Sequence, residues 1–403
     1  MSKLSKLIEE LCPEGVEYKR IDTLFETFSG MTGVSDKWKE SGNCQFIDYL
    51  NVYNNMRVDV KNLPFATVKS NQQNILKKGD ILLTCASETP DECAMSSVIR
   101  DDIKDGIFLD DHLFAIRLKD EYCGAVDTAF LNYYMHTSAF RVQVCKKVRG
   151  VTRFYITGKP FMSLEIPVPP LPVQEEIVRI LDKFTTLEAE LEAELEARRK
   201  QYEYYRNELL TFNKVGGVRF DVKWVTLGEI AEIGTGSSNT NEELEEGKYP
   251  FFVRSQVVRY KNEYEYDETA IITSGDGVGV GKVFHYIEGK YALHQRAYRI
   301  KINDGNLNSK FFYYYMRTTF YNYIMKNAYS SSVTSVRRPM LIKFPVPLPP
   351  LPVQRRIVSI LDRFEALTTD LQSGLPAEIK ARRKQYEYYR EKLLTFKLKT
   401  TLL

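Results

Sequence analysis

The sequence predicts two mixed α/β (α+β) modules joined by two long antiparallel coiled-coil helices, with pseudo-twofold symmetry between its halves. The first observation is the decapeptide ARRKQYEYYR, which occurs at 197–206 and again, unchanged, at 381–390. The second is a Pro-rich segment followed by a helical pattern, at 166–184 and at 344–364. The period of the repeat is near 184 residues (197 to 381), far longer than a solenoid unit, so we interpret the chain as a tandem duplication.

The duplicated unit has a variable part and a nearly constant part. The chain has 403 residues, which is more than one compact core usually holds. The constant parts match closely, whereas the variable parts align only weakly. We predict a first α/β module at 1–165, a central helix at 166–213, a second α/β module at 214–343 and a C-terminal helix at 344–403.

Each constant part begins with a rigid Pro-rich connector that cannot continue a helix. Apolar residues then recur three or four positions apart; in the first copy they include Ile177, Ile180, Phe184, Leu187 and Leu191. This spacing, with charges between the apolar residues, predicts a coiled-coil helix of roughly 60 Å in each copy. Gly374 and Pro376 should break the second helix. The first helix instead carries three tetrads of the LEAE type at 187–198.

The variable parts have the pattern of mixed α/β structure. Short β-prone runs bounded by turn signals occur at 79–85 and 269–275. Each module ends in an aromatic segment with a helical pattern, at 130–140 and 311–325. When the copies are aligned, the two modules place His112 and His294 at matching positions, which suggests a shared structural or contact role.

No stretch of the sequence has the pattern of a catalytic site. The segment SGDGVGVGKVF at 274–284 comes nearest, but a phosphate-binding P-loop needs Gly at Asp276 and Ser or Thr at Val283. A glycine-rich hairpin is favoured there instead. The four histidines are not at metal-ligand spacing. We therefore expect a chain that is not an enzyme and binds no metal or cofactor of its own.

The cysteines and the apolar segments indicate a reducing compartment. All six cysteines lie in the first 145 residues without a C-x-x-C pair, which favours scattered reduced thiols over a disulfide or zinc framework. The apolar segment LSKLIEEL at 4–11 is too short and too charged for a signal peptide, and no run is long enough to span a bilayer. We expect a cytoplasmic protein without a membrane partner.

Two tracts without acidic residues concentrate positive charge that the net charge of +3 conceals. They lie between Asp127 and Glu165 and between Asp304 and Asp362, and both interleave Arg and Lys with Tyr and Phe. Such tracts suit a polyanion such as DNA, whose phosphates would position the modules while nearby side chains read base edges. The predicted DNA contacts in these tracts are Lys146, Lys147, Arg149, Thr152, Arg153, Ser332, Thr334, Arg337 and Arg338.

Two divergent modules on a rigid spacer would read two different short DNA words at a fixed distance. One added tetrad is about one helical turn, or ~6 Å. This is close to two base-pair steps of duplex DNA, which rises about 3.4 Å per step.

With these features together, the chain resembles the specificity (S) subunit of type I restriction-modification systems over essentially its whole length. The resemblance rests on PPLPVQEEIVRILDKF at 169–184, PPLPVQRRIVSILDRF at 349–364, the two decapeptides and the tetrads. It implies two target-recognition domains that bind a bipartite, asymmetric site on double-stranded DNA. It also implies two modification (methyltransferase) subunits and, through them, two restriction (translocase and nuclease) subunits. S-adenosylmethionine, ATP and Mg²⁺ would then be bound by those partners.

The resemblance extends the set of expected DNA contacts. The segments 29–37 and 234–242 are similar to the family's loop that approaches DNA, and 148–154 and 330–338 are similar to its second contact loop. The further contacts expected are Thr32, Ser35, Lys37, Ser237, Ser238, Asn239 and Arg254. The first module departs from the family at 84–97, where the glycine-rich hairpin of the second module is missing.

The resemblance also explains why the decapeptide is kept unchanged. If the same partner docks twice, it needs the same surface twice, whereas modules that read different words are free to diverge. The partner-binding residues expected are Arg198, Arg199, Lys200, Glu203 and Arg206, and in the second copy Arg382, Arg383, Lys384, Glu387 and Arg390. The decapeptide tyrosines Tyr202, Tyr205, Tyr386 and Tyr389 fit the coiled-coil seam, so we assign them to packing.

Two other functions remain open at this point. A stand-alone DNA-binding regulator or architectural protein would bind its sequence tightly without a partner. A purely structural coiled-coil scaffold would show no salt-dependent DNA binding.

Overall fold

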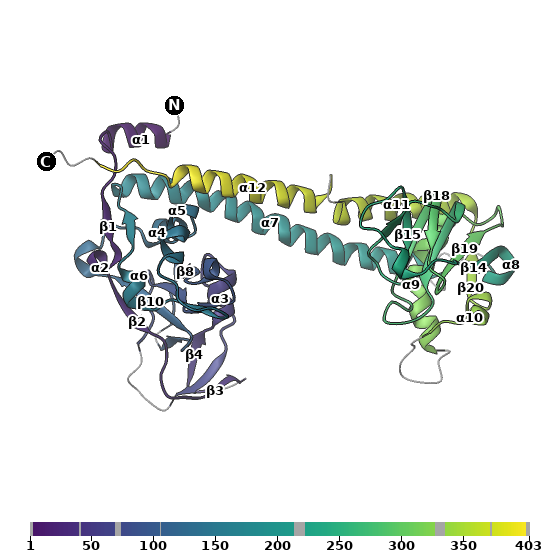
Figure 1. Cartoon of the computed structure of the whole chain (residues 1–403), viewed down its shortest axis with the longest axis horizontal. Coiled ribbons are helices and arrows are strands. Elements are labelled where there is room, and N and C mark those ends of the chain that lie inside the picture. Colours follow the sequence, from purple (N-terminus) through teal and green to yellow (C-terminus); the bar gives the residue numbers. More distant parts are fainter. Residues whose placement is uncertain are drawn as a thin grey trace. The chain divides into compact units, whose positions relative to one another are not determined.

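The computed structural model describes residues 3–39, 42–68, 74–104, 106–212, 222–326, 335–370 and 373–399, with the backbone alone at 35–39. The chain forms two compact units, one of residues 1–190 and 379–403 and the other of residues 191–378 (Figure 1). Each unit combines one α/β module with the stretches of long helix that pack on it. The four ranges predicted from the sequence separate the long helices from the modules, and these boundaries remain a prediction.

The first module contains two four-stranded sheets. The strands of the first sheet are, in spatial order, β2 (Phe25–Ser29), β10 (Leu113–Leu118), β6 (Ile81–Thr84) and β8 (Ser96–Val98). Those of the second are β3 (Val34–Lys39), β5 (Phe65–Val68), β4 (Cys44–Ile47) and β9 (Ile107–Leu109). All four residues of β6 are buried, as expected for a central strand with both faces covered. The strand prediction for 79–85 is therefore confirmed.

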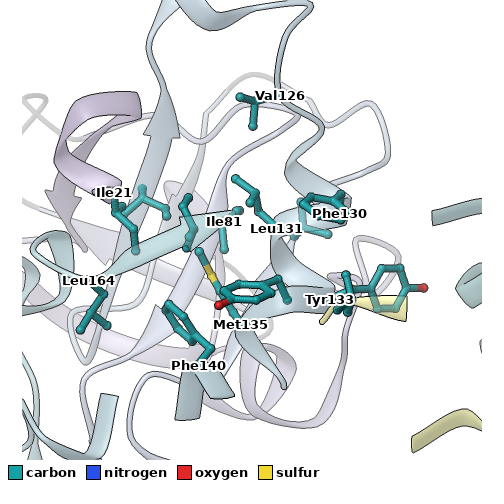
Figure 2. Close-up of a cluster of buried hydrophobic side chains, with 14 of the residues drawn as sticks. Ile21, Ile81, Val126, Phe130, Leu131, Tyr133, Met135, Phe140 and Leu164 are labelled. Carbon is teal, nitrogen blue, oxygen red and sulfur yellow. The ribbon is translucent and has the colours of Figure 1, made fainter. Parts of the chain in front are cut away.

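Short helices contribute apolar side chains to the buried clusters of the first unit. They are α1 (Lys3–Leu11), α2 (Ile21–Leu24), α3 (Tyr49–Asn54), α4 (Thr128–Met135), α5 (Ser138–Cys145) and α6 (Gly158–Met162). The Asp127 side chain accepts hydrogen bonds from the first amides of α4, and seven of that helix's eight residues are buried. Figure 2 shows part of this core, with Ile21, Ile81, Val126, Phe130, Leu131, Tyr133, Met135, Phe140 and Leu164 labelled. A two-stranded ribbon, β1 (Tyr18–Arg20) with β12 (Glu165–Pro167), links the module to its helix.

The second module repeats the first sheet. Its six strands are, in spatial order, β14 (Ala231–Thr235), β19 (Ala297–Ile302), β17 (Tyr266–Ser274), β18 (Phe284–Leu293), β15 (Tyr249–Phe252) and β16 (Arg259–Lys261). The order β14-β19-β17-β18 corresponds to β2-β10-β6-β8 of module 1, and the parallel pair β15-β18 corresponds to β4-β9. The aromatic segment predicted as helical forms α9 (Ser309–Lys326), and α8 (Leu227–Ile230) and α10 (Arg338–Ile342) match α2 and α6. The ribbon β13 (Lys223–Thr226) with β20 (Pro345–Leu348) repeats β1-β12.

The long helices follow the predicted pattern. Helix α7 (Leu171–Leu210) is continuous over 40 residues, whereas the second copy is divided into α11 (Leu351–Thr369) and α12 (Leu375–Leu393). The division falls where it was predicted, at Gly374. A Cβ atom there would lie 2.5 Å from the Ala366 carbonyl oxygen, so the position requires glycine.

Within each unit the helices pack antiparallel through aromatic pairs. In the first unit Phe184 of α7 stacks on Tyr389 of α12, with ring centroids 5.4 Å apart, and Glu188 forms an ion pair with Arg383. In the second unit Tyr202 and Tyr205 of α7 contact Phe364 of α11. Among the described residues, no helix combines the length and apolar character needed to cross a membrane.

The repeated Pro-rich entry is held by a buried glutamine. Gln174 has no exposed surface; its amide donates to the carbonyl oxygens of Ala125 and Pro169 at 3.0 and 2.6 Å and accepts from the Asp127 N–H at 2.8 Å. Gln354 makes the same three bonds in the second unit, to Asn306, Pro349 and Asn308. Each glutamine thus ties the start of a long helix to the loop that precedes the module's aromatic helix.

Candidate nucleic-acid interface and docking helices

Matching backbone hydrogen bonds show which residues of the two modules are equivalent at one exposed turn. The turn follows β9 in module 1 (110–112) and β18 in module 2 (294–296). The Asp110 N–H donates to the Ile47 carbonyl oxygen, and the His294 N–H donates to that of Phe252. The side chains of Asp110 and His294 then accept from the amides of His112 and Arg296, at 2.9 and 3.0 Å. The sequence alignment of His112 with His294 is therefore wrong by two positions: His294 matches Asp110, and His112 matches Arg296.

A second loop lies beside this turn in both modules. The His112 carbonyl oxygen accepts from the Cys85 N–H, and the Arg296 carbonyl oxygen accepts from the Gly275 N–H. In module 2, residues 275–283 connect the antiparallel strands β17 and β18, so the predicted glycine-rich hairpin is confirmed. In module 1 the corresponding stretch contains the short helix η1 (Pro90–Glu92).

In module 2, Asp276 of the hairpin forms ion pairs with two arginines. Arg296 lies on the turn, and Arg254 follows strand β15. Nη1 of Arg254 lies 2.6 Å from Asp276 Oδ1, and Nη1 of Arg296 lies 3.3 Å from Asp276 Oδ2. Partial burial opposes ionisation of this carboxyl, but the two guanidinium groups outweigh it and hold the pKa of Asp276 below its usual range. Arg296 is 60% exposed and Arg254 39% exposed, so both guanidinium groups face solvent.

In module 1 the equivalent place is a larger and more acidic pocket of about 1100 Å³. Its lining includes Tyr49, Glu88, Glu92, Asp111, His112 and Arg153. The Nδ1 atom of His112 lies 2.7 Å from the Asp111 carboxylate, and the Tyr49 hydroxyl donates to the Ala86 carbonyl oxygen at 2.9 Å. Burial raises the pKa of the Cys85 thiol, also in the lining, to about 11, so it stays protonated at neutral pH.

The same turn holds the one group of potential metal ligands found among the described residues. The ligand atoms of Asp110, Asp111 and His112 lie within 4.8 Å of one another. Hydrogen bonds and ion pairing between His112 and these carboxylates already account for the arrangement, and such exposed groups are common without a metal.

The predicted contacts of module 1 lie at its surface. Lys146, Lys147, Arg149, Thr152, Arg153 and Thr32 are exposed. Arg149 and Tyr155 exchange backbone hydrogen bonds of 2.9 and 2.8 Å, so the predicted contact loop is a closed turn, and Thr152 and Arg153 line the pocket described above. Ser35 and Lys37 lie on β3, and their side chains are outside the described part of the structure.

The predicted contacts of module 2 at 237–239 lie beside the turn that carries Arg296, since the Gln295 N–H donates to the Ser238 carbonyl oxygen. Ser238 is buried, and its hydroxyl is bonded by Glu265 and Lys261, so it positions the loop; Ser237 and Asn239 are exposed. Arg337 and Arg338 are exposed at the start of α10, whereas Ser332 and Thr334 lie outside the described residues. Sequence reasoning missed Arg296, Asp276 and Gln295. The correct register of the repeat places them opposite His112, Ala86 and Asp111. Of these three the sequence analysis singled out only His112, so the register would have drawn attention to Arg296 alone.

Most of the expected docking residues are exposed along the repeated decapeptide. Arg199, Lys200 and Glu203 are exposed on α7, as are Arg382, Arg383, Lys384 and Glu387 on α12, and Arg198 is half-buried with an ion pair to Glu194 at 3.3 Å. Arg206 and Arg390 instead fold back over the rings of Tyr202 and Tyr386, at 5.4 and 5.6 Å. Each copy also exposes an aromatic ring that the sequence analysis did not select: Tyr204 is 61% exposed and Tyr388 59%.

Comparison with known proteins agrees with this duplicated geometry. A model of the type I restriction-modification DNA specificity domain matches twice, at residues 13–197 and 220–381. The specificity subunit of a type I restriction enzyme from Escherichia coli is 35% identical over 271 residues, covering 60% of this chain and 66% of that protein. A putative type I restriction enzyme specificity subunit from Haemophilus influenzae is 29% identical over 294 residues, covering 67% of this chain and 73% of that protein.

The solved structures show the same fold. The type I restriction-modification S subunit from M. genitalium superimposes with a TM-score of 0.59 at 17% identity, covering 94% of this chain and 96% of that one. The S subunit from Thermoanaerobacter tengcongensis gives a TM-score of 0.53. The predicted fold class is confirmed by these likenesses. Since the family model covers most of the sequence in two copies, the chain belongs to the family of type I restriction-modification specificity proteins.

Proposed function

We propose that this chain is the DNA-recognition subunit of a type I restriction-modification complex. Each α/β module reads one half of a bipartite, asymmetric site on double-stranded DNA. The observation that carries this proposal is the contrast inside the repeat: the backbone of the exposed turn is the same in both modules, while the side chains that it presents differ. A shared scaffold with different side chains is what two different DNA words require.

The repeated helix faces support twin docking sites for two methyltransferase subunits. Each copy exposes the same Arg, Lys, Glu and Tyr side chains on a helix whose other face is packed. Aromatic and arginine side chains of this kind are enriched among residues that dominate protein interfaces. Two restriction subunits would join through the methyltransferases. S-adenosylmethionine, ATP and Mg²⁺ would be held by these partners, which supply the chemistry.

The test is native mass spectrometry of the chain co-expressed with type I methyltransferase subunits, followed by methylome sequencing of the expressing cells. We expect a complex of two methyltransferases and one copy of this chain, and one methylated bipartite word. Salt-sensitive, sequence-specific binding by the isolated chain without association would instead favour a stand-alone regulator. Neither association nor DNA binding would favour a structural scaffold.

A further inference from the structure

We propose that Arg254 and Arg296 each read one guanine in the half-site of module 2, and that module 1 reads a different chemical pattern with the equivalent positions. This inference rests on the proposed function and identifies a base-reading element within it. The first step is geometry. Asp276 contacts only Nη1 of each arginine in the hydrogen bonds given above, and both side chains are partly exposed, so each guanidinium group keeps further N–H donors for a ligand. A guanidinium held in this way can donate two parallel hydrogen bonds to O6 and N7 of guanine.

The second step is rigidity. Both arginines are fixed at their backbones: the Arg296 N–H donates a hydrogen bond to Nδ1 of His294, and the hairpin packs over the backbone of Arg254. A Cβ atom at Gly279 would lie 2.6 Å from the Arg254 carbonyl oxygen, so the hairpin can approach this closely only with glycine. Arg254 and Asp276 line a pocket of about 320 Å³ whose lining also includes Thr240, Ser255 and Val278. A pre-positioned pair loses little conformational freedom when it binds a base edge.

The third step is the contrast with module 1. The hydrogen bonds that align the modules place Tyr49 opposite Arg254 and His112 opposite Arg296. Instead of an arginine pair, the pocket of module 1 presents Asp111 and two glutamates beside His112. Carboxylates repel the acceptor atoms of guanine and accept from the exocyclic amino groups of cytosine or adenine. The same turn thus presents an arginine pair in module 2 and carboxylates in module 1, where Arg153 also lines the pocket.

The experiment uses the complex of this chain with its methyltransferase subunits and S-adenosylmethionine. A duplex library in which each position of the wild-type word is randomised in turn is methylated, and the methylated fraction is sequenced. In Arg296→Lys and Arg254→Lys the charge is kept but the bidentate fork is lost. We expect each to lose about 5- to 150-fold of discrimination for guanine at one position of one half-word, the range for a bidentate Arg–guanine contact. The other half-word and the salt dependence of binding should be unchanged.

Two variants serve as matched controls. Arg259→Lys alters an arginine of the same module that pairs with Glu243 outside the pocket, and it should leave the word unchanged. His112→Ala should change only the opposite half-word. If the lysine variants keep full guanine discrimination, the arginines do not read guanine and the inference is wrong. If the variants weaken binding to all sequences equally, the arginines contact phosphates, and the inference is again wrong. If the wild-type complex methylates no bipartite word, the proposed function itself fails, which is a separate result.

Discussion

At the scale of single residues, the two buried glutamines explain why the Pro-rich entry is repeated. Replacing Gln174 with Leu would leave two carbonyl oxygens and the Asp127 N–H without their partner in a buried site. We expect a loss of at least about 3 kcal/mol in the stability of the first unit, since each of these three groups, buried and unsatisfied, costs about 1–3 kcal/mol. Hydrogen–deuterium exchange should rise in that unit, whereas Gln354→Leu should act on the second unit.

Glu175→Ala is the control for this prediction, because its side chain is exposed on the same helix. It should leave exchange in both units unchanged. Equal exchange in the Gln174 variant and the wild type would show that the glutamine bonds do not stabilise the junction.

A second residue-scale prediction concerns His136 and acid. The Nε2 atom of His136 lies 2.8 Å from the Ser96 carbonyl oxygen, and burial lowers the pKa of this histidine from 6.5 to about 4. The unfolded chain therefore binds the proton first, so stability falls as pH drops from about 6.5 toward 4. We expect a loss of about 1–3 kcal/mol across this window. Urea unfolding of His136→Gln should show a weaker pH dependence.

Glu176 also makes the stability of the protein depend on pH, but in a lower pH range than His136. Hydrogen bonds from Arg179 and Lys3 lower the pKa of Glu176 from 4.5 to about 2. Its contribution to stability is thus present above about pH 4.5 and is lost only below it. If His136→Gln retains the wild-type slope between about pH 6.5 and 4.5, the histidine is not the responsible group.

At the scale of elements, the long helices could be predicted and the details of the loops could not. Apolar spacing and the Gly374 break are local properties, so the sequence shows them directly. The register of the exposed turns depends on long-range hydrogen bonds such as that from His294 to Phe252, which no local pattern reveals. This is why Asp276 was considered only as a misfit in a P-loop and Arg296 was not selected.

The element-scale prediction concerns the exposed tyrosines of the decapeptide. Tyr204→Ala or Tyr388→Ala should remove an interface aromatic without disturbing the seam, because both rings are exposed. We expect each single variant to weaken one docking site at least tenfold, as loss of an interface hot spot of about 2 kcal/mol would. Native mass spectrometry should then show one methyltransferase per chain, and none for the double variant.

Tyr202→Ala is the contrasting variant for the docking face. Tyr202 is buried against Phe364, so its loss should lower stability rather than change the docking surface directly. If both single variants at the exposed tyrosines keep the full complex, the partners dock elsewhere on the chain.

At the scale of the whole molecule, the duplication could be predicted from the sequence, because the two decapeptides and the two Pro-rich entries match closely. Under the proposed function, identity between the copies marks a surface that binds the same partner twice, and divergence on a shared strand order marks two different DNA words. Individual base contacts could not be derived in the same way, because they depend on which side chains the fold brings to one turn. Tyr49, Ala86 and His112 are far apart in the sequence of module 1, yet they occupy the positions of Arg254, Asp276 and Arg296.

The last prediction concerns the spacing of the two half-words. Deleting one tetrad, residues 191–194, removes one turn from α7, or about 6 Å of helix. The modules and their turns remain intact, so both half-words should be kept. The unspecified spacer between them should shorten by at most two base pairs, given a rise of about 3.4 Å per step. Methylome sequencing of cells that express the variant with its methyltransferase reads the words and the spacer together. An altered half-word, with the spacer unchanged, would show that α7 contributes to base recognition rather than setting the distance.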